Sequence, residues 1–248
     1  MGDHASPGCR LTLAAETPTE IFPPRVVDPD LAEVGRRLFA RDARFVAGAP
    51  EACTLPRDSL PEIAFAGRSN VGKSSLLNAL TGRRTLARIS NTPGRTRQIN
   101  FFDLCGRMML VDLPGYGYAE APKTEIRRWT ALLRAYLRSR STLRRVCLLV
   151  DSRRGLREID RPLMEMLDSS GVSYQIVLTK TDKVGAGELA TIAERTAAEL
   201  AARTAAHPEI HLTSAVKRRG IAALCATIGS LALADGAPSA VVLPLSSS

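Results

Sequence analysis

The stretch Gly67–Ser75 reads Gly-Arg-Ser-Asn-Val-Gly-Lys-Ser-Ser and fits the pattern G-x-x-x-x-G-K-[ST]. Its glycines allow a turn whose backbone N–H groups converge on an anion, and a helix that starts at the lysine points its positive end at the same anion. An apolar run, 63–66, precedes the stretch, and leucines at helical spacing follow it. A purely structural glycine turn could also match, but these flanks favour a phosphate-binding loop.

Two further motifs each follow an apolar run that is typical of a strand. In Asp112-Leu-Pro-Gly115, the carboxylate can hold Mg²⁺ through water, and the Gly115 N–H can bond a γ-phosphate. In Thr179-Lys-Thr-Asp182, the carboxylate can accept N1–H and N2–H₂ of guanine, which adenine does not offer, and Lys180 can cover the ring. Each motif alone is also typical of a solvated turn. Together with the phosphate loop they indicate a guanine-nucleotide site.

The amino-acid sequences of these and neighbouring segments resemble those of the EngB family of bacterial GTPases, which are implicated in assembling the large ribosomal subunit. The shared segments are Gly67–Ser75, Pro93–Phe102, Asp112–Ala119, Thr179–Lys183 and Thr213–Gly220. The resemblance spans residues 25–232 and implies an α/β fold of the Ras-like P-loop GTPase type, with a mostly parallel six-stranded sheet flanked by helices on both faces. Thr179 replaces the Asn that is common among GTPases, but the family itself uses Thr there.

The resemblance also implies a set of site residues. Lys73, Thr96 and Asn70 are expected to act in hydrolysis, and Ser74 and Thr96 to be the two protein ligands of Mg²⁺. The residues expected around the nucleotide are Gly67, Arg68, Ser69, Asn70, Val71, Gly72, Lys73, Ser74, Gly94, Arg95, Thr96, Arg97, Gln98, Asp112, Leu113, Pro114, Gly115, Thr179, Lys180, Thr181, Asp182, Thr213, Ser214 and Ala215.

The partners that the resemblance implies are GTP or GDP and a large ribosomal subunit precursor with its rRNA. It implies a cytoplasmic protein that is needed for normal cell division and septation. We expect a monomer that binds neither DNA nor membranes. A tRNA-modification or translation-factor GTPase is less well supported, because such proteins carry large additional domains. A nucleotide-gated rRNA-binding scaffold, in which turnover is incidental, remains an alternative to a GTPase switch.

Two positions concern the rate of hydrolysis. Tyr116 stands where Ras-like proteins place the Gln that orients the attacking water, and a phenol is poorly suited to that task. Asn70 matches the position that holds K⁺ in potassium-activated GTPases, so K⁺ could supply the missing positive charge. Asn70 could equally serve only to tighten the loop. An internal arginine finger, Arg95 or Arg97, is a competing explanation.

Composition and periodicity define the rest of the chain. Of 248 residues, 45% are hydrophobic and 24% are charged, as in ordinary soluble domains. The Pro-containing segment 1–24 and the tail 233–248 are predicted to be disordered, which leaves one GTPase domain at 25–232. Five cysteines without C-x-x-C spacing indicate reduced thiols rather than zinc ligands or disulfides. No apolar run reaches membrane-spanning length.

Hydrophobic periodicity predicts the order of helices and strands. We expect helices over 31–40, from 73 onward, over 123–140, 158–169 and 187–206, and a last helix ending near 232. We expect strands at 62–66, 98–104, 108–111, 146–150, 173–178 and 209–212, with 45–47 as a further candidate. The basic segment 83–97 has no apolar period and is predicted to be a loop.

The net charge of +9 suits a polyanionic partner, although solubility alone also explains a basic surface. On the predicted helix 123–140, one face carries the apolar residues Ile126, Trp129, Leu133 and Leu137 and is expected to be core. Arg127, Arg134 and Arg138 share another face, within about 40° of one another. Residues 126–150 hold seven arginines and no acid. This run is either a solvated face or a contact for rRNA phosphates, with Lys217–Arg219 as a second candidate.

Overall fold

The computed structural model describes residues 28–57, 59–83, 86, 98–117 and 122–233. Its strands are β1 (Ala43–Ala49), β2 (Glu62–Gly67), β3 (Ile99–Leu104), β4 (Met108–Asp112), β5 (Leu143–Asp151), β6 (Tyr174–Thr179) and β7 (His211–Leu212). Its helices are α1 (Pro29–Phe39), α2 (Lys73–Thr81), α3 (Lys123–Ser139), α4 (Arg161–Ser169), α5 (Ala186–Leu200) and α6 (Ile221–Leu233), with short 3-10 helices η1 (Ala52–Thr54) and η3 (Thr181–Lys183). The segments 1–24 and 234–248 and most of 83–97 lie outside the described residues, so their disorder and the domain boundaries stay predictions.

The strands form one sheet in the order β1-β3-β4-β2-β5-β6-β7. Neighbours from β4 to β7 pair in parallel, whereas β3 pairs antiparallel with β4 and with β1. Six strands are expected from the sequence, and the described residues form seven, because β1 adds an antiparallel edge. The sequence signal of β1 is weak, since its middle is exposed and its register shifts between Phe45 and Ala47. The α/β class and the mostly parallel sheet are confirmed.

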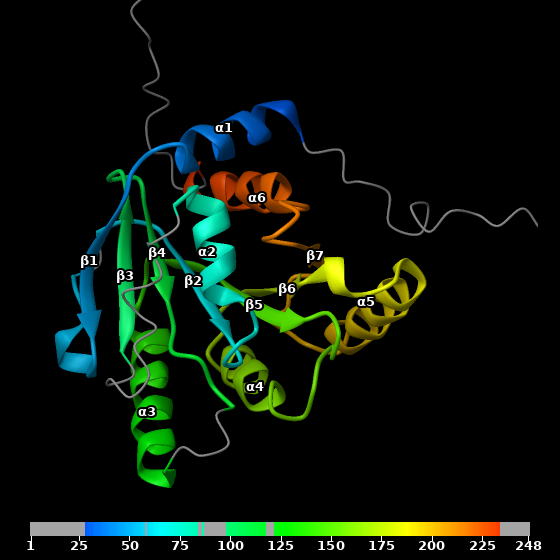
Figure 1. Ribbon diagram of the computed structural model, residues 1–248. Helices are drawn as coiled ribbons and strands as arrows, with labels where there is room; N and C mark the ends of the chain where they lie inside the picture. Colours follow the sequence, from blue (N-terminus) through cyan, green and yellow to red (C-terminus); the bar gives the residue numbers. More distant parts are fainter. Residues whose placement is uncertain (1–27, 58, 84–85, 87–97, 118–121, 234–248) are drawn as a thin grey trace, which may run out of the picture.

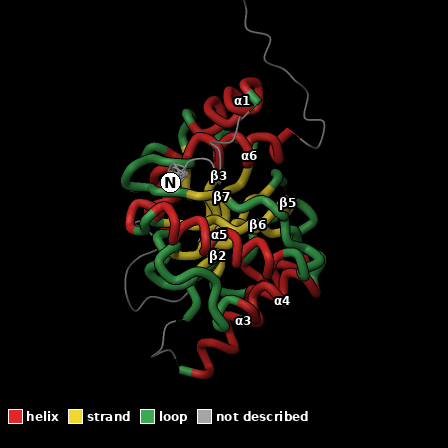
Figure 2. The backbone as a smooth tube through the Cα atoms, turned by 90° about the vertical axis from the view of Figure 1, so that its right-hand side faces the viewer, coloured by secondary structure: helices red, strands yellow, loops and turns green. Residues whose placement is uncertain are grey.

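Helices cover both faces of the sheet, as Figure 2 shows with α1 and α6 on one side and α3 and α4 on the other. One hydrophobic core lies between the sheet and α3, α4 and α5, and includes Val146, Leu148 and Val150 of β5. The second core lies between the sheet and α1, α2 and α6, and includes Leu77 and Leu224. Each central strand is therefore buried on both sides, which explains its nearly continuous apolar sequence.

Two expectations about helices are wrong. The Ala-rich helix expected to reach residue 206 ends at Leu200, because Ala205 and His207 exchange backbone hydrogen bonds with Tyr174 and so run beside β6. Ile126, expected in the core, is 45% exposed, because the first turn of α3 lies beyond the sheet (Figure 1). Two further elements are shorter than expected: α4 begins at Arg161, and β7 has only two residues.

Candidate functional site

The predicted motifs meet at one edge of the sheet. The phosphate loop (Gly67–Ser74) follows β2, the Asp112 loop (Asp112–Gly117) follows β4, and two further loops follow β6 and β7. Because these strands are parallel, their carboxyl ends lie together, which is where open α/β sheets bind ligands. Segments that are more than 100 residues apart in the sequence, such as Val71 and Thr179, are joined here by a hydrogen bond.

The phosphate loop needs its glycines for steric reasons. A Cβ at Gly67 would lie 2.9 Å from Val71 Cγ1 and 3.0 Å from the Leu149 carbonyl oxygen, so no larger residue fits. Gly72 has a φ of 103°, a conformation that side chains disfavour, and it delivers the chain into α2 at Lys73. Asn70 also lies in the left-handed region, with a φ of 63°. The resulting turn can direct successive N–H groups toward an anion at the start of α2.

The side chains at the start of α2 bring opposite charges together. The Lys73 ammonium contacts the carboxylate of Asp112, which is almost completely buried at the end of β4. Ser74 is the next residue of the helix. An ammonium, a carboxylate and a hydroxyl thus surround the helix N-terminus, and this donor set fits a phosphate group together with a hard, oxygen-seeking cation.

The Asp112 loop runs directly against the phosphate loop. The Ser69 N–H donates to the Tyr116 carbonyl oxygen at 2.9 Å, and the Tyr116 N–H donates to the Gly67 carbonyl oxygen at 3.3 Å. Gly115 lies so close to Ser69 that a Cβ there would be 3.2 Å from its hydroxyl. Leu113 and Pro114 are buried, so their side chains belong to the core and only their backbone faces the site.

The phenol of Tyr116 is bound by Asp160, the residue before α4. Its hydroxyl donates to Asp160 Oδ1 at 2.8 Å, and its ring packs on that of Trp129 with centroids 6.0 Å apart. Burial, reinforced by the Asp160 charge, raises the pKa of Tyr116 well above its ordinary value, so the phenol stays protonated. The side chain of Arg68 likewise turns toward Asp160 and the Gly155 carbonyl oxygen, so its predicted place around the nucleotide can involve only its backbone.

The loops after β6 and β7 hold each other in place. The Thr181 N–H donates to the Thr213 carbonyl oxygen at 3.1 Å, and Ser214 Oγ donates to Asp182 Oδ1 at 2.6 Å. The hydrogen bond from Ser214 is the main reason that the pKa of Asp182 lies below its ordinary value. Asp182 therefore stays an ionised acceptor at neutral pH. Ala215 is half-buried beside them.

The same region also clamps the phosphate loop. Thr179 Oγ1 donates to the Val71 carbonyl oxygen at 2.7 Å, and Lys180 Nζ donates to the Asn70 carbonyl oxygen at 2.6 Å. Lys180 Nζ also donates to Asp151 at 3.0 Å. Burial tends to raise the pKa of Asp151, but hydrogen bonds from Arg153 and Lys180 hold it well below its ordinary value.

The predicted residues of the segment 94–98 need separate treatment. Gly94, Arg95, Thr96 and Arg97 lie outside the described residues, so the second Mg²⁺ ligand and the arginine finger stay predictions. Gln98 is described, and its amide donates to Asn100 Oδ1 at 2.9 Å and covers Gly48 of β1. Its side chain therefore points to the edge of the sheet.

Two carboxylates at the site have no counterpart in the sequence prediction. Asp151 ends β5, and an acid that follows an apolar strand is a signal that could have found it. Asp160 is fully buried and receives both Tyr116 and Arg68. Its sequence signal is only that of a residue before a helix with Pro162 in its first turn.

The arginine run 126–150 divides into two groups. Arg127, Arg134 and Arg138, which we name the α3 arginine face, are exposed. The other four differ from one another. Arg140 is buried against Glu62, so it is wrongly included in a basic surface, whereas Arg128 stays exposed and pairs with Glu51. Arg144 and Arg145 are half-buried near the start of β5. Lys217, Arg218 and Arg219 are exposed in the turn after β7.

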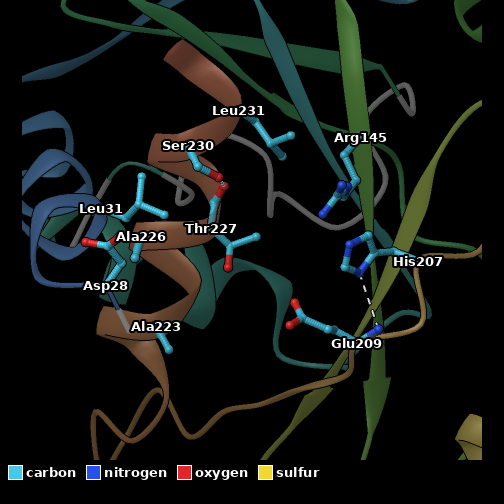
Figure 3. A pocket seen from close by; sticks show the side chains of 10 residues that line it. All are labelled: Asp28, Leu31, Arg145, His207, Glu209, Ala223, Ala226, Thr227, Ser230 and Leu231. Atoms are coloured by element: carbon cyan, nitrogen blue, oxygen red, sulfur yellow. Dashed lines mark hydrogen bonds between the residues drawn. The ribbon is translucent and has the colours of Figure 1, made fainter. Parts of the chain in front are cut away.

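A hollow of about 290 Å³ lies near the amino ends of the parallel strands, beside the start of β5. Figure 3 shows Arg145, His207 and Glu209 facing Thr227 and Ser230 of α6. None of the predicted site residues lines it. Within the described part of the chain, no group of three His, Cys, Asp or Glu side chains is suited to holding a metal ion, and no helix has the length and apolarity that crossing a membrane requires.

Comparison with known proteins agrees with this geometry. Residues 62–180 match the family described as 50S ribosome-binding GTPase. "Probable GTP-binding protein EngB" of Rhodospirillum rubrum is 57% identical over 205 residues, which cover 81% of this chain and 89% of that protein. Its namesake in Hyphomonas neptunium is 53% identical over 204 residues, with 81% and 93% covered.

A solved structure, the crystal structure of a probable GTP-binding protein engB, superposes with a TM-score of 0.54 at 25% identity and covers 69% of this chain and 98% of its own. The Ras-like P-loop fold and the recognised family are thereby confirmed. The loops at the carboxyl edge of the sheet are those of a chain that belongs to the EngB family of GTP-binding proteins, and this protein is a P-loop GTPase.

Proposed function

We propose that this GTPase binds Mg·GTP at the carboxyl edge of its sheet, hydrolyses it to GDP and phosphate, and thereby switches its contact with precursors of the large ribosomal subunit in the cytoplasm. One observation carries the nucleotide part: the phosphate loop, Asp112–Gly115 and the Asp182–Ser214 pair all meet at one edge. The matching family description, 50S ribosome-binding GTPase, supports the ribosomal part. Loss of the protein would then limit the supply of ribosomes, and cell division and septation would be impaired as a consequence.

In this proposal the described residues divide the work on the phosphates. The N–H groups of the phosphate loop cradle the phosphate oxygens, and Lys73 moves from Asp112 to the β- and γ-phosphates. When bound, Mg²⁺ neutralises charge on these phosphates; Ser74 would hold it directly, Asp112 through water, and Thr96 as a second direct ligand. The Gly115 N–H, which the close packing on Ser69 keeps beside the loop, would bond the γ-phosphate.

Guanine selection is assigned to Asp182. The ionised carboxylate of Asp182 offers only acceptors, and these match N1–H and N2–H₂ of guanine. The hydrogen bond from Ser214 lowers the pKa of Asp182 further and holds the carboxylate in place. The backbone N–H of Ala215 would reach the guanine O6. The stem of Lys180, fixed by its bonds to Asn70 and Asp151, would cover the ring.

Phosphate release from GTP tests the assignment. Lys73→Ala removes the cation that would reach the β- and γ-phosphates, so we expect hydrolysis to be lost. Arg195→Ala is the control, since this arginine is exposed on α5, outside the loops of the site. Hydrolysis by Lys73→Ala at the wild-type rate would contradict the proposed site.

The source of positive charge for hydrolysis is assigned to K⁺ near Asn70. Tyr116 is engaged with Asp160, which supports a mechanism without a water-orienting residue at position 116. We expect faster turnover in K⁺ than in Na⁺ at equal ionic strength, and no such difference for Asn70→Ala. If instead the ion makes no difference and Arg95→Ala or Arg97→Ala abolishes turnover, the finger is supported.

The α3 arginine face is the proposed contact for rRNA phosphates. Its three guanidinium groups are exposed on one side of the helix, and no ion pair to them is found within the described residues. Counterion release makes such contacts salt-dependent, with the slope falling by about one for each lost phosphate contact.

Sedimentation with large ribosomal subunits tests this contact. We expect the triple change Arg127→Gln, Arg134→Gln and Arg138→Gln to weaken binding and to flatten its salt dependence. The triple change Arg41→Gln, Arg107→Gln and Arg195→Gln removes the same charge from exposed positions elsewhere and should bind as wild type does. Equal losses in both triples would mean that only net charge matters and would contradict the assignment.

A further inference from the structure

Asp160 is a carboxylate that the folded chain buries completely beside the candidate site. Its Oδ1 accepts the Tyr116 hydroxyl at 2.8 Å and lies 3.3 Å from Arg68 Nε, and its Oδ2 accepts the Arg157 N–H at 2.9 Å. A buried charge is tolerated only when it is paired and hydrogen-bonded, and here each oxygen has a partner. The two side-chain partners come from two different loops of the site.

The backbone of Asp160 is itself firmly held. Its carbonyl oxygen accepts the N–H groups of Leu163 and Met164, so it forms the start of α4. Both of these residues are buried in the core under the sheet. Figure 1 shows the start of α4 beside the carboxyl end of β2. Asp160 therefore presents its carboxylate to the loops from a fixed position.

The two loops that Asp160 receives are also joined to each other. Arg68 belongs to the phosphate loop and Tyr116 to the Asp112 loop, and their backbones form a parallel bridge. Tyr116 is thus fixed at its backbone by the phosphate loop and at its hydroxyl by α4. Gly117, with a φ of 74°, then passes close to Ile159, the neighbour of Asp160.

We propose that Asp160 is a positioning residue for GTP hydrolysis: it holds Tyr116 and Arg68 so that the Gly115 N–H stays at the distance from the phosphate loop that the γ-phosphate requires. This inference rests on the proposed nucleotide site. Asp160 is fully buried and acts through Tyr116 rather than on the nucleotide itself. It keeps the Asp112 loop in a fixed position relative to the phosphate loop. This matters because small displacements of reacting groups strongly lower the rate of a reaction.

Tyr116→Phe and Asp160→Ala test the proposal, because the first removes the donor of their hydrogen bond and the second removes the acceptor. We expect either change to lower kcat by about 10- to 100-fold with GDP affinity unchanged, because the phosphate and guanine contacts are intact. The double variant should be no slower than the slower single variant, since Tyr116→Phe and Asp160→Ala break the same hydrogen bond. Trp129, the single tryptophan of the chain, packs on Tyr116, so its fluorescence response to GTP should also shrink in both variants.

Two matched controls exclude a general effect of these substitutions. Tyr174→Phe removes a buried hydroxyl that has no hydrogen-bond partner within the described residues. Asp168→Ala removes a carboxylate of α4 that binds Arg203, away from the loops. Both should retain wild-type kcat.

The outcomes separate this inference from the proposed function. If wild type neither binds nor hydrolyses GTP, the proposed function fails. If wild type hydrolyses GTP and both Tyr116→Phe and Asp160→Ala keep its kcat, the role of Asp160 is overturned. It is also overturned if the double variant loses the product of the two single effects, because Tyr116 and Asp160 would then act independently. Should Asp160→Ala fail to fold, Tyr116→Phe alone decides, since it leaves the Arg68–Asp160 pair intact.

Discussion

Removing one partner of the buried pair Glu62–Arg140 should strongly destabilise this fold. The side chains are 1% and 3% exposed, and Arg140 Nε donates to Glu62 Oε1 at 3.0 Å. Glu62 also accepts the Tyr136 hydroxyl at 2.8 Å. Arg140→Met would leave this carboxylate charged and without its cation. Loss of one partner of a buried pair typically costs about 3–5 kcal/mol.

Urea unfolding of the nucleotide-free protein measures this cost. With a denaturant slope of about 2 kcal/mol/M, the midpoint should fall by roughly 1.5–2.5 M. Replacing both partners, Arg140→Met with Glu62→Gln, should cost less than the sum of the single changes, because no unpaired charge remains. Arg138→Met, two residues away and exposed, should change stability by less than about 0.5 kcal/mol. Equal midpoints for Arg140→Met and Arg138→Met would refute the reasoning.

Three further predictions follow from local geometry. Gly67→Ala should abolish GTP binding in titration calorimetry, because its Cβ would collide with Val71 and Leu149. Gly187→Ala has open space around its Cβ and should raise the free energy of unfolding by about 0.5–1 kcal/mol, measured by scanning calorimetry. Burial raises the pKa of Cys147 to about 12, so this thiol should resist alkylation at pH 8 until the protein unfolds, which mass spectrometry detects. Ser214→Ala removes the bond that lowers the pKa of Asp182, so protonation will occur at higher pH, and GTP affinity measured on acidification should fall earlier than in wild type.

The parts of the site that the sequence predicts correctly are those whose signal lies in a few consecutive residues. The phosphate loop requires glycine at particular positions for steric reasons, and Gly67 and Gly72 meet that requirement within eight residues of chain. Asp182 could be placed because it follows a strand whose apolar run is unambiguous. Local chemistry and local structure coincide at these positions.

The remaining features depend on contacts between distant segments. Arg138 and Arg140 look alike in the sequence, but only Arg140 meets Glu62, which is 78 positions away. Asp160 resembles any residue before a helix until folding brings Tyr116 and Arg68 to it. Residues 201–206 have a composition that is typical of a helix. Their backbone instead pairs with the start of β6 at Tyr174, and a continued helix would lose this pairing. Burial and tertiary pairing decide these cases.

The central claim, a guanine-nucleotide site at the carboxyl edge of the sheet, is tested most directly by base exchange at Asp182. Titration calorimetry should show that wild type binds Mg·GTP and discriminates against Mg·ATP and Mg·XTP. Asp182→Asn should lose about 10- to 100-fold in GTP affinity and gain affinity for XTP, because an amide N–H can donate to the second carbonyl of xanthine. Unchanged GTP affinity in Asp182→Asn, with no gain for XTP, would contradict the account.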